Sequence, residues 1–332
     1  MLSKKIGIDL GTSTVLVYVK GEGVVVNEPA LMATDGKGGR VLAIGRAASQ
    51  LVGRGGKART VRPVRDGNGV DYGVAGAMLQ HLIGRIVGRQ RIFRPDVMLS
   101  VGPMVTGVER RAVLEATMQA GAKTAYLIDK PMAAAIGAKV AVSSTDGIVV
   151  VNLGAGSTEM ALIVLGEIVA IQSIPTGGDA LDRAIEASLA RTRGVRLKPG
   201  DAERLKLEVG SAITPVNEAS IELNGDRDAS GAPLRVSSTE VQAAIREPLE
   251  AIVAGLQRLL AQVPEARRTA VNRNGLVLSG GGAQLPGMGQ FLTARVGIPA
   301  RVASDPQSCV AVGTGMALDN LQVVRRGQHY IT

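Results

Sequence analysis

The sequence predicts an α/β protein built from two related domains. Its 332 residues exceed one typical domain, and a hydrophobic content of 45% is ample for buried cores. Apolar runs of strand length alternate with segments of helical periodicity, a pattern that favours mixed or parallel sheets covered by helices. One strand–turn–strand pattern also occurs twice, so we expect two homologous halves.

The repeated pattern is a buried strand, a glycine-rich turn and a returning strand. Its first copy spans residues 6–19, with the turn at 11–13, and its second copy spans residues 148–164. Asn152 holds the place in the second copy that Asp9 holds in the first. A repeat of this kind indicates a duplicated domain.

Periodicity predicts the elements that connect the two copies. A helix is expected over residues 74–87 and a buried strand at 97–101. A helix over 109–120, a short strand at 125–128 and an alanine-rich helix from Pro131 to 139 follow, with proline acceptable in the first turn. This alternation supports the α/β assignment.

The domain boundaries follow from the repeat. The first domain is expected over residues 1–143 and the second over 144–317. Each carries a smaller subdomain, at about 32–66 in the first domain, where large apolar residues are few, and at about 179–239 in the second. A C-terminal helix over about 318–332 is expected to pack back on the first domain.

Composition argues against several classes of protein. With a single cysteine, Cys309, and two histidines, neither a disulfide nor a zinc site is favoured. No apolar run approaches the ~20 residues of a spanning helix and no signal peptide precedes the first strand, which predicts a cytoplasmic protein. The formal charge of +9 indicates an anionic partner, but two Phe, four Tyr and no Trp leave little for stacking single-stranded nucleic acid.

The two glycine-rich turns are candidate phosphate-binding elements. Facing each other across a cleft, they would direct backbone N–H groups at phosphates from both sides. Asp9 would add a carboxylate that holds Mg²⁺ through its water shell. Each turn taken alone is explained equally well by the conformational need for glycine, so the argument depends on the pair.

Two further segments suit the rest of a purine nucleotide. A strand ending at Ser279 runs into a turn over which a flat adenine has room to lie, formed by Gly280, Gly281, Gly282 and Ala283. Glu203 and Lys206 share one face of a predicted helix, where they would hydrogen-bond ribose hydroxyls, with Arg204 beside them. An ordinary solvated helix face is the alternative for these three residues.

The order of these segments, together with further short motifs, resembles the bacterial actin MreB family over nearly the whole chain. That family is part of the actin, sugar-kinase and heat-shock chaperone ATPase superfamily. The motifs are NEP from Asn27, MLQH from Met78, VERRA from Val108, PMAAAIG from Pro131, AERLK from Ala202 and EPL from Glu247.

The resemblance implies an actin-like fold, with two duplicated α/β domains and smaller inserted subdomains around a nucleotide cleft. It implies ATP or ADP with Mg²⁺, self-assembly into filaments on the anionic inner face of the cell membrane, and a role in cell shape with the wall-elongation machinery, without direct nucleic-acid binding. The nucleotide-binding residues that it implies are Gly11, Thr12, Ser13, Thr14, Gly154, Ala155, Gly156, Ser157, Thr158 and Gly313.

Two catalytic positions depart from the family pattern, whereas Asp9 is kept. Lys130 replaces the second glutamate of a Glu-Glu-Pro-Met motif, and Asn152 replaces an aspartate. Because both carboxylates are expected to act on the metal or the attacking water, we expect ATP to bind but to be hydrolysed very slowly, with Lys130 contacting or shielding the γ-phosphate. The alternatives are a conventional filament ATPase in which Asp129 takes over the missing role, and a plasmid-segregating actin.

A short basic segment is a candidate membrane contact. Ile92 and Phe93 stand between Arg89, Arg91 and Arg94, at the point where the family carries a hydrophobic membrane loop. Apolar side chains flanked by cations suit an anionic bilayer surface. The alternative is that Phe93 packs under its own domain.

Overall fold

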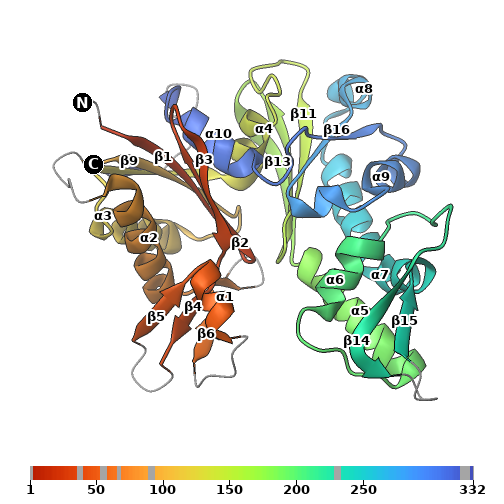
Figure 1. The fold of residues 1–332 in the computed structure, drawn as a ribbon. Coiled ribbons are helices and arrows are strands. Elements are labelled where there is room, and N and C mark those ends of the chain that lie inside the picture. The colour runs from red at the N-terminus through yellow and green to blue at the C-terminus, as the bar shows by residue number, and fades with distance from the viewer. Residues whose placement is uncertain are drawn as a thin grey trace.

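Two lobes, each built on a β-sheet, flank a central pair of helices (Figure 1). The computed structural model describes residues 3–35, 40–52, 58–65, 69–88, 94–227, 233–321 and 330–331. Within them, no helix combines the length and hydrophobicity that crossing a bilayer requires.

The first lobe contains a six-stranded mixed sheet. Its strands, in spatial order, are β18 (Tyr330–Ile331), β10 (Thr124–Asp129), β9 (Asp96–Val101), β1 (Lys5–Leu10), β2 (Thr14–Val19) and β3 (Gly23–Pro29). Strand β1 pairs antiparallel with β2 and parallel with β9. Helices α2 (Tyr72–Val87) and α3 (Gly107–Gln119) share a buried core with this sheet.

The second lobe repeats the arrangement with a five-stranded sheet. Its strands, in spatial order, are β13 (Glu167–Ile174), β12 (Thr158–Val164), β11 (Ile148–Leu153), β16 (Leu276–Ser279) and β17 (Ala300–Val302). Strand β11 pairs antiparallel with β12 and parallel with β16, as β1 pairs with β2 and β9. The duplication predicted from the two hairpins is therefore present in the topology. The helices of this lobe are α5 (Gly178–Arg193), α6 (Asp201–Val209), α7 (Ser238–Ala261), α8 (Glu265–Asn274) and α9 (Met288–Val296).

A smaller subdomain extends from each lobe at the lower end of the view in Figure 1. The first contains β4 (Met32–Thr34), β5 (Val41–Ile44), α1 (Arg46–Val52) and β6 (Arg59–Val61). A short hairpin of β7 (Val64–Arg65) and β8 (Gly69–Val70) leads from it to α2. In the second lobe, the hairpin β14 (Ser220–Arg227) and β15 (Pro233–Ser237) packs against α6 and α7.

Side-chain caps explain where three of the helices begin. The Asp71 carboxylate accepts a hydrogen bond from the Val74 N–H at 3.1 Å and starts α2. Thr106 with Glu109, and Ser237 with Glu240, form reciprocal capping boxes at the starts of α3 and α7. Each satisfies backbone donors that the first helical turn leaves unpaired.

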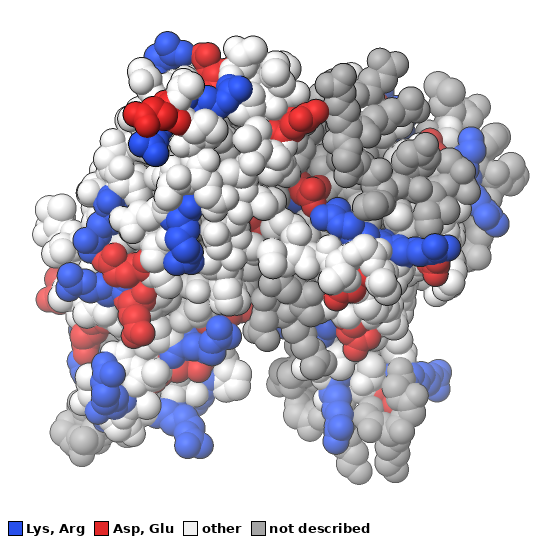
Figure 2. Space-filling view, turned by 180° about the vertical axis from the view of Figure 1, so that it is seen from behind, with Lys and Arg blue, Asp and Glu red and all other residues white. Residues whose placement is uncertain are grey.

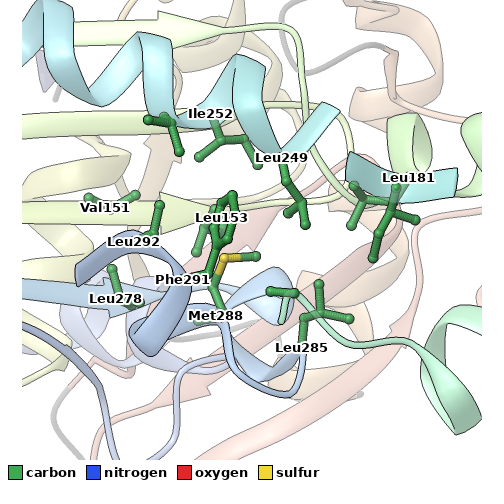
Figure 3. Close-up of a cluster of buried hydrophobic side chains, with 14 of the residues drawn as sticks. Val151, Leu153, Leu181, Leu249, Ile252, Leu278, Leu285, Met288, Phe291 and Leu292 are labelled. Carbon is green, nitrogen blue, oxygen red and sulfur yellow. The ribbon is translucent and has the colours of Figure 1, made fainter. Parts of the chain in front are cut away.

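The second lobe has the largest continuous core, part of which is drawn in Figure 3. Leu153 from β11, Ile252 from α7 and Phe291 from α9 meet between the sheet and its helices (Figure 3). Leu181 and Leu285 lie at the border of this cluster, where the core meets the cleft described below.

The two lobes are joined by helices α4 (Lys130–Gly137) and α10 (Cys309–Ala317), which cross in backbone contact. A Cβ atom added to Gly313 would lie 1.8 Å from the Ala133 carbonyl oxygen, and one added to Gly137 would lie 1.8 Å from the Cys309 carbonyl oxygen. Both helices also share a core with the inner faces of the two sheets. Only glycine permits this approach.

The end of the chain packs on the first lobe as a strand. Tyr330 and Ile331 pair antiparallel with Tyr126 and Ala125 of β10. The expected helix over 318–332 is therefore wrong for these last residues, while 322–329 lie outside the described residues. Without β18, β10 would end the sheet with unpaired backbone groups, and aromatic and β-branched residues suit that edge.

The glycine contact between α4 and α10 predicts a large stability effect. Gly313→Ala should lower the free energy of unfolding by about 2 kcal/mol or more, because the new methyl group has no space against Ala133. The midpoint of urea unfolding measures it.

Gly84→Ala in α2 is the matched control, since a Cβ there meets nothing within 4 Å. Both substitutions gain the same helix propensity, up to about 1 kcal/mol, so only the control should be neutral or stabilised. Equal midpoints for the two variants would contradict the proposed close approach.

Candidate functional site

A cavity of about 430 Å³ lies between the lobes, where the two repeated hairpins face each other. The first hairpin contributes Asp9 and residues 11–14 to its lining, and the second contributes Asn152 and residues 154–157. Residues 280–282, which begin the turn after β16, line the same cavity. Its volume is that of a typical small-molecule site.

Both hairpin turns have the same local geometry. The Gly11 N–H donates to the Thr14 carbonyl at 3.0 Å, and the Gly154 N–H donates to the Ser157 carbonyl at 2.9 Å. A Cβ atom at Gly11 or Gly154 would lie within 3 Å of the same carbonyl oxygens. The tight turn itself therefore requires glycine, and the case for a ligand comes from the convergence of both turns on one cavity.

Four predicted residues do not line the cavity. Thr158 is buried and its hydroxyl donates to the Thr176 carbonyl, while the Arg204 guanidinium donates to the Glu222 carbonyl. Ala283 belongs to the core of the second lobe, and Gly313 is used in the helix crossing. Glu203, Lys206 and Lys130 do line it.

Lys130 is the first residue of α4 and is 9% exposed. Its ammonium lies 3.8 Å from Oδ1 of Asp9, and that oxygen also accepts a hydrogen bond from the Ser100 hydroxyl at 2.6 Å. The two catalytic positions predicted in the first lobe are thus in contact, as a cation and an anion at the wall of the cavity.

Asn152 lies in a chain of buried polar groups. Its Nδ2 donates to Oε2 of Glu159 at 2.9 Å, its Oδ1 accepts from the Ser279 hydroxyl at 3.2 Å, and the Ser157 hydroxyl donates to Oε1 of Glu159 at 2.5 Å. Glu159 is 1% exposed and lines the cavity. Both ends of the Asn152 amide are therefore held.

Sequence reasoning missed Glu159, although a signal was present. In the antiparallel pair β11–β12, Asn152 stands directly opposite Glu159. Directly opposed residues of an antiparallel pair have neighbouring side chains on one face of the sheet. Counting outward from the Gly154 to Ser157 turn gives this register and would have placed a carboxylate beside Asn152.

Asp129 does not occupy the position that the alternative mechanism requires. Its Oδ1 accepts from the Arg110 guanidinium at 2.5 Å, and Asp129 is not among the residues that line the cavity. A direct ion pair of this kind holds the carboxylate against α3.

Lys206 lines the cavity from α6, and its ammonium is held by a partner that the sequence did not suggest. Its ammonium lies 2.8 Å from Oδ1 of Asp182 and donates to the Gly178 carbonyl at 3.2 Å. Burial raises the pKa of the Asp182 carboxyl, and the nearby Lys206 only partly offsets this increase.

Sequence reasoning also missed four further residues that line the cavity, namely Gln284, Leu285, Pro286 and Gln307.

The residues around Asp9 fit Mg²⁺ poorly. Lys130 places a positive charge beside the Asp9 carboxylate, and the oxygens of Glu159 already accept from Asn152 and Ser157. Lys130 is thus the residue that would oppose the expected water-mediated Mg²⁺ at Asp9.

The Cys309 thiol and the basic segment 89–94 lie outside this cavity lining. The Cys309 thiol is buried, and burial raises its pKa to about 11, so it is protonated at neutral pH. Arg94 is exposed, while Arg89, Arg91, Ile92 and Phe93 of the predicted membrane loop lie outside the described residues.

The fold and the interlobe cavity define an actin-like protein. Over 98% of this chain and 99% of the other, the structure matches MreB5 of Spiroplasma citri, solved with ADP and with AMPPNP, at 30% identity and a TM-score of 0.89. It also matches MamK from a double helical filament, with a TM-score of 0.80 over 95% of this chain and 98% of the other, where 18% identity shows the fold alone.

Sequence comparison gives the particular family. The family model described as MreB/Mbl protein matches residues 3–326. The cell shape-determining protein MreB of Escherichia coli (strain K12) is 40% identical over 332 aligned residues, covering 97% of this chain and 95% of that protein. The cell shape-determining protein Mbl of Bacillus subtilis (strain 168) is 36% identical, with 97% of both chains covered. The chain belongs to the MreB/Mbl family.

Proposed function

We propose that the protein binds ATP or ADP in the interlobe cavity. The observation that carries this proposal is the convergence of both hairpin turns and the turn after β16 on one cavity. Glu203 and Lys206 lie on the same lining, where ribose hydroxyls would meet them. The likeness to MreB5 of Spiroplasma citri, which was solved with ADP and AMPPNP, supports the same ligand class.

The nucleotide-bound protein is proposed to assemble into cytoskeletal filaments that serve cell shape and wall elongation. Support comes from the relatives, whose names describe cell shape determination. The third candidate, a plasmid-segregating actin, would use a basic surface near DNA. On the face shown in Figure 2, acidic side chains are interspersed with the basic ones among the described residues, so this face gives that candidate no support.

Electron microscopy tests assembly. Purified protein with ATP should form filaments, and if nucleotide serves assembly more than turnover, ADP should support them equally well. Filaments that appear with ATP and disassemble as phosphate is released would favour a conventional ATPase cycle, and an absence of polymer in all conditions would contradict the proposal.

Hydrolysis is proposed to be very slow. Lys130 and Asn152 stand where two carboxylates are expected, and the Asn152 amide is hydrogen-bonded to Glu159 and Ser279. Asp129 is held by Arg110, which argues against the alternative in which it positions the attacking water.

A phosphate-release assay on assembled protein measures the rate of ATP hydrolysis. Restoring both carboxylates in Lys130→Glu/Asn152→Asp should raise the rate by about 10² or more, because losing a general base or water-positioning group costs about 10² to 10⁴. Asp129→Asn should leave the slow basal rate unchanged. A wild-type rate that falls sharply in Asp129→Asn would instead assign catalysis to Asp129.

Attachment to an anionic membrane surface is proposed through the segment 89–94. Its two apolar residues flanked by arginines suit a bilayer interface, and because so few residues bind weakly, filament avidity would have to supply the rest.

Co-sedimentation with vesicles containing anionic lipid tests the membrane contact. Ile92→Ser/Phe93→Ser should reduce pelleting several-fold, because it removes the apolar area that enters the interface. Val216→Ser, at a residue that is 96% exposed in the second lobe, is the control and should pellet as the wild type does. Unchanged pelleting of the double variant would remove this segment from the proposal.

A further inference from the structure

The Lys130 ammonium has no close hydrogen-bond partner among the described residues of the folded protein. The residue is 9% exposed, and its nearest anion in the described part of the chain is Asp9, at 3.8 Å, which is beyond hydrogen-bond distance. The ammonium makes no hydrogen bond to another described residue, and the residue lines the interlobe cavity. A cation in the first turn of a helix is also disfavoured by the helix dipole, and Lys130 is the first residue of α4.

Asp9 and Glu159, two carboxylates that line the cavity, already have partners within the protein before any ligand enters. Asp9 contributes one negative charge and Lys130 one positive charge. Asn152 is neutral, and both oxygens of the nearby Glu159 accept hydrogen bonds from within the wall. A hydrated dication at Asp9 would therefore meet a repelling ammonium beside that carboxylate.

A triphosphate at the two hairpin turns needs positive charge close to its oxygens. The turns supply N–H dipoles, and Lys130 lines the same cavity with three donors and a full charge. The ammonium has the compact charge and the position to take the role that a divalent cation usually has beside phosphates.

We propose that Lys130 is a built-in substitute for the divalent cation, so that this protein binds ATP with nearly the same affinity whether or not Mg²⁺ is present. This inference rests on the proposed nucleotide site and adds to it the identity of the counter-charge. Lys130 thereby becomes a residue that touches the phosphates, and Asp9 positions it.

Isothermal titration of ATP into the full-length protein, in buffer with Mg²⁺ and in buffer with EDTA, tests the inference. For the wild type, the two dissociation constants should agree within about threefold, since the counter-charge is covalently attached. In Lys130→Glu, removal of Mg²⁺ should weaken binding by at least about tenfold, because a carboxylate then faces phosphates with no cation between them. Lys130→Gln, which removes the positive charge without adding a negative one, should fall between the two.

Lys123→Glu is the matched control for a change of two charge units in the same lobe. Lys123 is exposed and immediately precedes β10, whereas Lys130 immediately follows it, so the strand separates the control from the cavity. This variant should bind ATP as the wild type does in both buffers. Thermal unfolding of each variant establishes that it is folded, and the wild-type comparison decides the question even if Lys130→Glu fails to fold.

The outcomes separate the two proposals. Wild-type binding that is at least tenfold weaker in EDTA would overturn the role of Lys130 and leave the nucleotide site in place. Wild-type protein that binds ATP in neither buffer would overturn the nucleotide site itself, and the role of Lys130 with it.

Discussion

The crossing of α4 and α10 is the contact on which the arrangement of this protein depends. Gly137 and Gly313 let the two backbones touch, and the joined pair sits between the inner faces of both sheets. Each helix also begins at the cavity, through Lys130 in α4 and Val310 in α10. The same packing that holds the lobes together therefore fixes how far apart the two hairpin turns stand.

Much of this architecture could be predicted from the sequence because it is encoded locally. The hairpin turns require glycine at fixed positions, and the capping box at Ser237 and Glu240 marks the start of α7. Hydrophobic periodicity then gave the connecting helices and strands, and the repeated hairpin gave the duplication. None of these features needs knowledge of distant contacts.

Several of the features that sequence reasoning missed or misplaced depend on long-range geometry. Gly313 was assigned to the nucleotide, yet its missing side chain makes room for Ala133. Arg204 lies beside two cavity residues on α6 but points to the β14 backbone, because neighbouring helical residues face different directions. Asp182 reaches Lys206 from another helix, and the strand at Tyr330 forms only because β10 offers an edge.

The Asn152 amide links three strands of the second lobe through its hydrogen bonds. It ties β11 to β12 through Glu159 and to the end of β16 through Ser279, one residue before the turn proposed to face the adenine. Side-chain hydrogen bonds thus connect three strands in the wall that the second lobe presents to the cavity. Any group that contacts one of these side chains would therefore meet a wall whose polar groups are held across three strands.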